Sequence, residues 1–146
     1  MCIRDRNNIL AVILAGGKSQ RFGNDKSIVK LGDKTLLEHT IELIESKFTE
    51  ILLVSNNKNL KLNKKNIFLI KDCIEGQLGP LVGVLSAMKW AETNKKECSW
   101  IATFPCDTPY FKSTIIDQMI SRIKISNSKI SRPKVFRNKM FILKAK

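Results

Sequence analysis

The chain has 146 residues, of which 43% are hydrophobic, and its 26 Lys and Arg against 13 Asp and Glu give a formal net charge of +13. This length suits one domain with a sizeable core. No apolar run is as long as a membrane span, and the N-terminus lacks the layout of a signal peptide. Four cysteines without paired spacing and a single histidine disfavour structural zinc and a disulfide framework. We therefore expect a cytoplasmic protein that does not enter a membrane.

The positive charge is concentrated towards the C-terminus. From Arg122 onward there are nine Lys or Arg and no acidic residue, so residues 1–121 carry a net charge of only +4. A nucleic-acid surface needs basic residues on a folded face, with aromatic residues for base stacking, whereas residues 125–146 contain only Phe136 and Phe141 as aromatics. We expect no specific nucleic-acid partner, and a basic nucleic-acid-binding module stays as the alternative from another functional class.

Strands and helices alternate along the chain after an N-terminal extension, residues 1–8, whose first six residues resemble a translated adapter sequence. Short apolar runs predict strands at Ile9–Leu14, Ile51–Val54, Ile67–Ile70 and Trp100–Phe104. Apolar residues at helical spacing predict helices that begin near Thr35, Pro80 and Ser113. The first of these helices has a capping box, in which Thr35 and Glu38 satisfy the free backbone N–H groups.

Each predicted helix has an apolar face, and His39 lies off the face of the first helix, so we assign it no catalytic role. The predicted apolar faces are Leu37, Ile41, Ile44 and Phe48; Leu81, Leu85 and Met88; and Ile116, Met119, Ile120 and Ile123. Non-alternating apolar strands interleaved with helices predict an α/β fold, in three α/β/α layers around a mainly parallel sheet.

Ligands of such sheets bind beyond the carboxyl ends of the strands, so the residues that follow each strand are the candidate site. In chain order these are Gly16-Gly17, Ser55-Asn56-Asn57, Asp72 and Asp107. The pattern places groups suited to phosphate, hydroxyl and metal at one edge of the sheet.

A glycine-rich loop follows the first strand. Gly16 and Gly17 lack a Cβ and let backbone N–H groups approach an anion, and Lys18, Arg21 and Lys26 follow within a dozen residues. A Walker loop would need glycine where the chain has Val12, and the spacing of the glycines does not fit a dinucleotide fingerprint. We interpret the segment as a phosphate-binding loop; the alternative is an ordinary strand-to-helix turn with surface lysines.

Asp107 lies in a turn between two prolines, and we assign it as a magnesium ligand. Magnesium needs only one or two protein carboxylates in addition to substrate phosphates. The alternative is a turn or helix-capping aspartate without a ligand.

The segment LAGGKSQRFGNDK at residues 14–26 resembles the motif of the molybdenum cofactor guanylyltransferase family of nucleotidyltransferases. The resemblance implies a Rossmann-like nucleotidyltransferase fold in which Leu14, Ala15, Gly16, Gly17 and Lys26 bind GTP. It also implies that Arg21 and Lys26 neutralise phosphate charge during catalysis.

Two further segments carry the resemblance, CDTP at residues 106–109 and GPLVG at residues 79–83. They imply that Asp107 holds magnesium, that Asp72 contacts the nucleotide, and that the loop at Gly79 lies beside base and ribose. The family has an asparagine directly after the second strand; here that position is Ser55, followed by Asn56, and either is the candidate base contact.

The resemblance implies transfer of GMP from GTP to molybdenum-molybdopterin, with release of pyrophosphate, by a monomer. A CTP-dependent relative, or a transferase acting on a sugar or alditol phosphate, is the alternative. We expect residues 9–124 to form the nucleotidyltransferase domain. We interpret residues 125–146 as a basic tail from a truncated or frameshifted reading, and expect nucleotide binding with weak or absent transfer.

Overall fold

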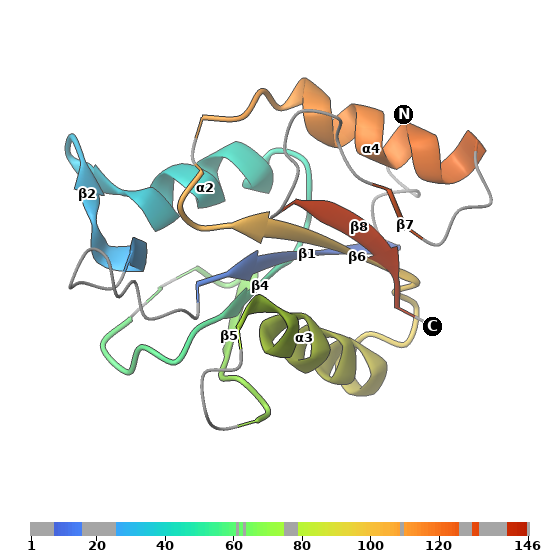
Figure 1. The fold of residues 1–146 in the computed structure, drawn as a ribbon, viewed down its shortest axis with the longest axis horizontal. Coiled ribbons are helices and arrows are strands. Elements are labelled where there is room, and N and C mark those ends of the chain that lie inside the picture. Colours follow the sequence, from blue (N-terminus) through green and yellow to red (C-terminus); the bar gives the residue numbers. More distant parts are fainter. Residues whose placement is uncertain are drawn as a thin grey trace.

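A computed structural model describes residues 8–15, 26–60, 62, 64–74, 79–108, 110–125, 130–131 and 140–145. Its main sheet has six strands in the order β5-β4-β1-β6-β8-β7 (Figure 1). The strands are β1 (Ile9–Leu14), β4 (Ile51–Val54), β5 (Ile67–Ile70), β6 (Trp100–Pro105), β7 (Ile130–Ser131) and β8 (Phe141–Lys144). The helices are η1 (Lys26–Ile28), α2 (Leu36–Glu45), α3 (Pro80–Asn94) and α4 (Thr114–Ile125). The predicted α/β class and the predicted strands are confirmed.

The strands β1, β4, β5 and β6 are parallel to one another, whereas β8 runs antiparallel to β6. The central strand, β1, is buried on both faces, and Ala11, Val12 and Ile13 have no exposed surface. A strand that packs helices on both faces needs apolar residues at every position. The apolar run at Ile9–Leu14, from which β1 was predicted, is continuous because both faces of the strand are covered.

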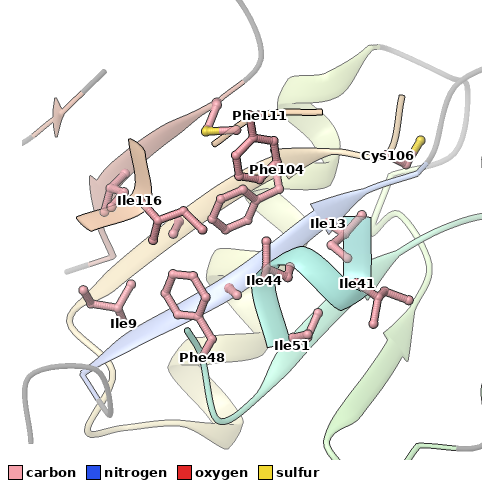
Figure 2. Packing of buried hydrophobic residues seen from close by; sticks show 14 of the residues in the cluster. Ile9, Ile13, Ile41, Ile44, Phe48, Ile51, Phe104, Cys106, Phe111 and Ile116 are labelled. Atoms are coloured by element: carbon pink, nitrogen blue, oxygen red, sulfur yellow. The ribbon is translucent and has the colours of Figure 1, made fainter. Parts of the chain in front are cut away.

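Helices α2 and α4 cover one face of the sheet, and α3 covers the other (Figure 1). Figure 2 shows the larger core, a cluster that includes Ile41 and Ile44 of α2, Phe104 of β6 and Ile116 of α4. Phe104 packs edge-on to Phe48, at a centroid distance of 5.6 Å, and parallel to Phe111, at 5.8 Å. Burial of the predicted apolar faces of α2 and α4 therefore holds both helices on this face of the sheet, and α3 on the other face completes the three layers.

The capping box of α2 is formed as predicted. The Thr35 hydroxyl accepts a hydrogen bond from the Glu38 backbone N–H at 3.2 Å, and the Glu38 carboxylate accepts one from the Thr35 backbone N–H at 2.7 Å. The hydrogen bonds donated by the Thr35 backbone N–H and then by its hydroxyl hold the pKa of Glu38 below its ordinary value.

The predicted apolar face of α3 is wrong for Leu81 and Leu85, whereas Met88 is partly buried and packs against the smaller core. Leu81 is 75% exposed and Leu85 is 37% exposed. The face that packs on the sheet is instead made of smaller residues: Val82, Gly83, Val84, Ser86, Ala87 and Ala91. Gly83, Ala87 and Ala91 recur every four residues, and small side chains at this spacing let the helix approach the sheet closely.

The C-terminal segment contributes to the sheet. Strand β8 pairs with β6, Ile142 lies opposite Ala102, and Met140 and Ile142 are 2% and 1% exposed within the larger core. The domain was expected to end at residue 124, but β8, which follows that residue, is a strand of the same sheet.

Strands β2 (Lys30–Leu31) and β3 (Lys34–Thr35) form a hairpin beside the carboxyl ends of the parallel strands (Figure 1). Gly32 turns it with a φ of 67°, in the left-handed region. His39 of α2 donates from Nε2 to the Leu31 carbonyl at 2.9 Å and so ties the hairpin to the helix. No helix in the described part of the chain is long and apolar enough to cross a membrane.

Candidate nucleotide site at the strand ends

The register of the parallel strands aligns their carboxyl ends. Leu14 lies opposite both Val54 and Pro105, and Val54 lies opposite Ile70. Two residues further along the chain these strands reach position 16, Asn56, Asp72 and Asp107. The predicted convergence of the strand-end residues on one edge of the sheet is therefore confirmed for Asn56, Asp72 and Asp107.

The order in which successive strands are added to the sheet reverses at β1. The chain adds β4 and β5 on one side of β1 and then returns to add β6 on the other. Open α/β sheets bind ligands outside the carboxyl ends at such a switch point. The position between the ends of β1 and β6, where Asp107 follows β6, is thus the topologically favoured site.

The ends of β4 and β5 are joined by a reciprocal pair of hydrogen bonds. Asn56 Nδ2 donates to Asp72 Oδ2 at 2.7 Å, and the Asp72 backbone N–H donates to Asn56 Oδ1 at 3.1 Å. Ser55 is different, because it is 2% exposed and its hydroxyl accepts the Asn57 backbone N–H at 3.2 Å. Of the two candidate residues after β4, only Asn56 has an exposed side chain.

The second carboxylate oxygen of Asp72, Oδ1, is buried and has no hydrogen-bond partner among the residues that the structure describes. It lies beside Gly83, where a Cβ would be 3.6 Å from Asp72 Oδ1 and 3.0 Å from Leu14 Cδ2. The absence of a side chain at Gly83 lets α3 pack directly on the ends of β1 and β4, beside Asp72. Leu14 and Asp72, both predicted site residues, are thereby brought together.

The N-terminus of α3 faces the same region. Gly79 precedes it with φ 89° and ψ −175°, a conformation that is essentially restricted to glycine, and Pro80 occupies the first helical position. Ser86 anchors the helix, since its Oγ accepts the Cys73 backbone N–H at 2.8 Å and donates to the Val82 carbonyl at 2.7 Å. These bonds fix the start of α3 relative to Asp72.

Asp107 is half-buried in the turn after β6. Its Oδ1 accepts the Thr108 hydroxyl at 3.3 Å, and Thr40 of α2 donates to the neighbouring Cys106 carbonyl at 3.5 Å. Neighbouring strands lie about 4.8 Å apart, so Asp72 and Asp107, three strand intervals apart, are separated by about 14 Å. A single small ion cannot contact both, whereas an extended ligand can span them.

The donor set at Asp107 fits a magnesium ion shared with phosphates. The described residues contain no cluster of three or more His, Cys, Asp or Glu that could enclose a metal. Magnesium takes one or two protein carboxylates and completes its shell with waters and substrate phosphates. One accessible carboxylate with a hydroxyl beside it suits that chemistry.

The glycine-rich loop lies outside the described residues, and with it the predicted positions of Gly16, Gly17 and Arg21. Lys26 begins η1, but its side chain is also outside them. Ala15 is described, and its backbone N–H donates to the Val54 carbonyl at 2.9 Å, so pairing of β1 continues to the last residue before the loop.

Sequence reasoning missed the role of Ser86 and the pairing of Asn56 with Asp72. A serine within a helix commonly bonds the carbonyl four residues back, as Ser86 does, but only the fold shows that it also receives the Cys73 N–H. The pairing of Asn56 with Asp72 spans sixteen residues of sequence and depends on the register of β4 and β5.

The sequence of this chain is similar to those of known proteins. The family model described as "MobA-like NTP transferase domain" matches residues 11–140. A molybdenum cofactor guanylyltransferase from Shewanella halifaxensis is 33% identical over 114 residues, which cover 77% of this chain and 54% of the relative. One from Yersinia pseudotuberculosis is 34% identical over 113 residues, which cover 77% of this chain and 55% of the relative. The chain thus spans about half the length of these curated relatives.

A solved structure shares the fold. It is the molybdopterin-guanine dinucleotide biosynthesis protein A from Archaeoglobus fulgidus, with a TM-score of 0.71 at 17% identity. The match covers 93% of this chain and 67% of that one. At this level of identity the likeness supports the architecture, a nucleotidyltransferase-type α/β sheet.

Proposed function

The chain belongs to the MobA-like NTP transferase domain family, and from this premise we propose that it acts in the transfer of GMP from GTP to molybdenum-molybdopterin, with release of pyrophosphate. The observation that carries the proposal is the register that brings Asn56, Asp72 and Asp107 to the edge at which β1 enters the glycine-rich loop. The names of the curated relatives favour guanylyl transfer over its CTP-dependent counterpart.

In this proposal the nucleotide lies along the carboxyl edge of the sheet. The nucleoside part lies over the ends of β4 and β5, near Asp72 and the loop at Gly79, with Asn56, the exposed residue of the two candidates after β4, beside it. The triphosphate follows the end of β1, through Leu14 and Ala15, towards Asp107. The separation of about 14 Å between the two aspartates suits an extended ligand.

The loop after β1 would bind the phosphates. Backbone N–H groups of Gly16 and Gly17 would face phosphate oxygens, because glycine permits close approach of the backbone. Arg21 and Lys26 would neutralise the charge that builds up as pyrophosphate leaves. Positioning and electrostatic stabilisation of this kind are the main contributions of a protein to phosphoryl transfer.

The reaction exchanges one phosphorus–oxygen bond for another. An oxygen of the acceptor phosphate bonds to the α-phosphorus of GTP, and the bond from that phosphorus to the bridging oxygen breaks as pyrophosphate leaves. Asp107 would hold magnesium, which supplies positive charge to the phosphate oxygens when bound. The remaining work of the chain is to orient the nucleotide and the acceptor.

The first test is nucleotide preference. Calorimetric titration of the chain with GTP and with CTP, each with magnesium, should give tighter binding of GTP. A preference for CTP would replace guanylyl transfer with cytidylyl transfer, and salt-dependent binding of nucleic acid without binding of either nucleotide would favour the alternative functional class. Release of pyrophosphate on addition of molybdenum-molybdopterin would then test the transfer step itself.

Cytoplasmic location, action as a monomer and the choice of magnesium among divalent ions belong to the same proposal. Sedimentation of the purified chain should give a single species of the mass of one chain. Replacement of magnesium by calcium, which takes more ligands at longer distances, should weaken nucleotide binding.

A further inference from the structure

We propose that Asn56 is a positioning residue, which holds the Asp72 carboxylate in one orientation for a hydrogen-bond donor on the nucleoside part of the nucleotide. The inference rests on the proposed function, in which Asp72 contacts the nucleotide. It assigns a function to Asn56 that acts through Asp72 and not by direct contact with the base.

The chemistry of the pair requires an amide at position 56. Asp72 offers an acceptor, its carboxylate oxygen, and a donor, its backbone N–H. Asn56 Nδ2 donates to the carboxylate at 2.7 Å, and Asn56 Oδ1 accepts from the backbone N–H at 3.1 Å. An amide side chain carries both a donor and an acceptor, whereas an ionised carboxylate only accepts. Asn56 therefore fixes the Asp72 side chain and its backbone together.

The orientation that Asn56 holds is unfavourable for Asp72 alone. Oδ1 is buried beside Gly83, and no described residue forms a hydrogen bond with it; a buried acceptor left unpaired is costly. If released, the carboxylate would gain by turning Oδ1 towards water. The bond from Asn56 to Oδ2 opposes that rotation and keeps the remaining lone pairs of Oδ2 in a fixed direction.

A buried polar atom without a hydrogen-bond partner needs an explanation in a native structure. One explanation is that the group is held ready to bind a ligand. The packing around Asp72 supports this explanation, because Gly83 closes one side of the carboxylate and Asn56 holds the other. Removal of Asn56 should then weaken nucleotide binding with little loss of stability, since solvation of Oδ1 offsets the lost hydrogen bonds. A purely structural contact would instead lower stability.

The experiment is a double-mutant cycle on GTP binding in magnesium, by calorimetry, with Asn56→Ala, Asp72→Ala and the double variant. We expect Asn56→Ala to weaken binding about tenfold, the loss that follows from one hydrogen bond to a charged group. In the Asp72→Ala background the same change should alter affinity by less than about twofold, because the group that Asn56 positions is gone.

Two further variants sharpen the test. Asn56→Asp keeps the shape but removes the donor, and should weaken binding at least as much as Asn56→Ala. Asn94→Ala is the matched control, since it removes an exposed Asn side-chain hydrogen bond, to the Trp90 carbonyl at 2.9 Å, at the other end of α3. It should bind GTP like the wild-type chain, with an unfolding free energy similar to that of Asn56→Ala.

The outcomes separate the two proposals. If the wild-type chain binds GTP, any of three results would overturn the positioning role and leave the proposed function intact. The first is a further tenfold loss of affinity when Asn56→Ala is added to Asp72→Ala, and the second is unchanged affinity in Asn56→Ala. The third is a loss of affinity in Asn56→Ala that unfolding of the variant accounts for. Failure of the folded wild-type chain to bind GTP in magnesium would overturn both.

Discussion

Strand β8 offers a test of whether the C-terminal segment belongs to the same cooperative unit as the candidate site. Ile142 is 1% exposed, lies opposite Ala102 of β6 and packs in the larger core. Truncation of a fully buried Ile to Ala removes about 2–5 kcal/mol of stability, including the cavity that it leaves. A domain is stable by about 5–15 kcal/mol, so Ile142→Ala should remove a large part of the total.

The assay is urea unfolding followed by circular dichroism, with Lys144→Ala as the matched control on the same strand. Lys144 is exposed, and surface substitutions change stability by less than about 0.5 kcal/mol. We expect the midpoint of Ile142→Ala to fall while the denaturant dependence of its unfolding free energy stays unchanged. If Ile142→Ala unfolds like the control, β8 is not part of the unit that unfolds with the site, and the reasoning is refuted.

Four further predictions concern α2, the start of α3 and the phosphate loop. Thr35→Ala should lower the unfolding free energy by about 1 kcal/mol through loss of the cap. Because the pKa of Glu38 is lowered in the native state, Glu38 stabilises that state above the ordinary pKa of a glutamate, and this contribution is lost as pH falls through the lowered pKa. Glu38→Gln should therefore flatten the decline of the unfolding free energy in that acid range. An unaltered pH profile would contradict this role of Glu38. Gly79→Ala should cost about 1–3 kcal/mol through backbone strain, because Gly79 has a positive φ and, its chain neighbours aside, no atom of the described residues lies within 4 Å of the added Cβ; equal midpoints in urea would contradict this. Lys26→Ala should weaken GTP about tenfold or more while leaving GMP nearly unchanged, as expected for a lysine on the outer phosphates, and an equal loss for both nucleotides in calorimetry would disprove that placement.

The continuous apolar runs were enough to predict β1, β4 and β6 and the fold class. Ile9–Leu14 has no polar alternation because helices cover both faces of its sheet. The capping box at Thr35 and Glu38 was predictable for a similar reason, since its residues interact with near neighbours in sequence. Most of the architecture could therefore be predicted from interactions between near neighbours in sequence and from the apolar runs of buried strands.

The packing face of α3 could not be predicted from apolar volume. The large residues Leu81 and Leu85 predicted the inner face, but Gly83 sits against Leu14 and leaves no room for a side chain of that size. Closeness of approach, and not hydrophobicity, decides which side of this helix faces the sheet. The sequence holds the signal as small residues at every fourth position, and it becomes readable only once the neighbouring strand is known.

The candidate site divides in the same way. Asp72 and Asp107 were identified because they directly follow strands, and the alignment of the strand ends confirmed that they share one edge. The hydrogen bonds between Asn56 and Asp72 could not be predicted, because they depend on which strands are neighbours and in which register. Residue type and position were enough to predict which residues share this edge of the sheet, whereas the hydrogen bonds between them depend on tertiary pairing.

The most direct measurement is the magnesium dependence of GTP binding by the wild-type chain, by Asp107→Asn, and by Asp117→Asn as a control on α4. We expect magnesium to tighten GTP binding by the wild-type chain and by the control. In Asp107→Asn that gain should be lost while the unfolding free energy and the metal-free affinity are retained. Equal magnesium dependence in Asp107→Asn, or no binding of GTP by the folded wild-type chain, would contradict a nucleotide site at the strand ends.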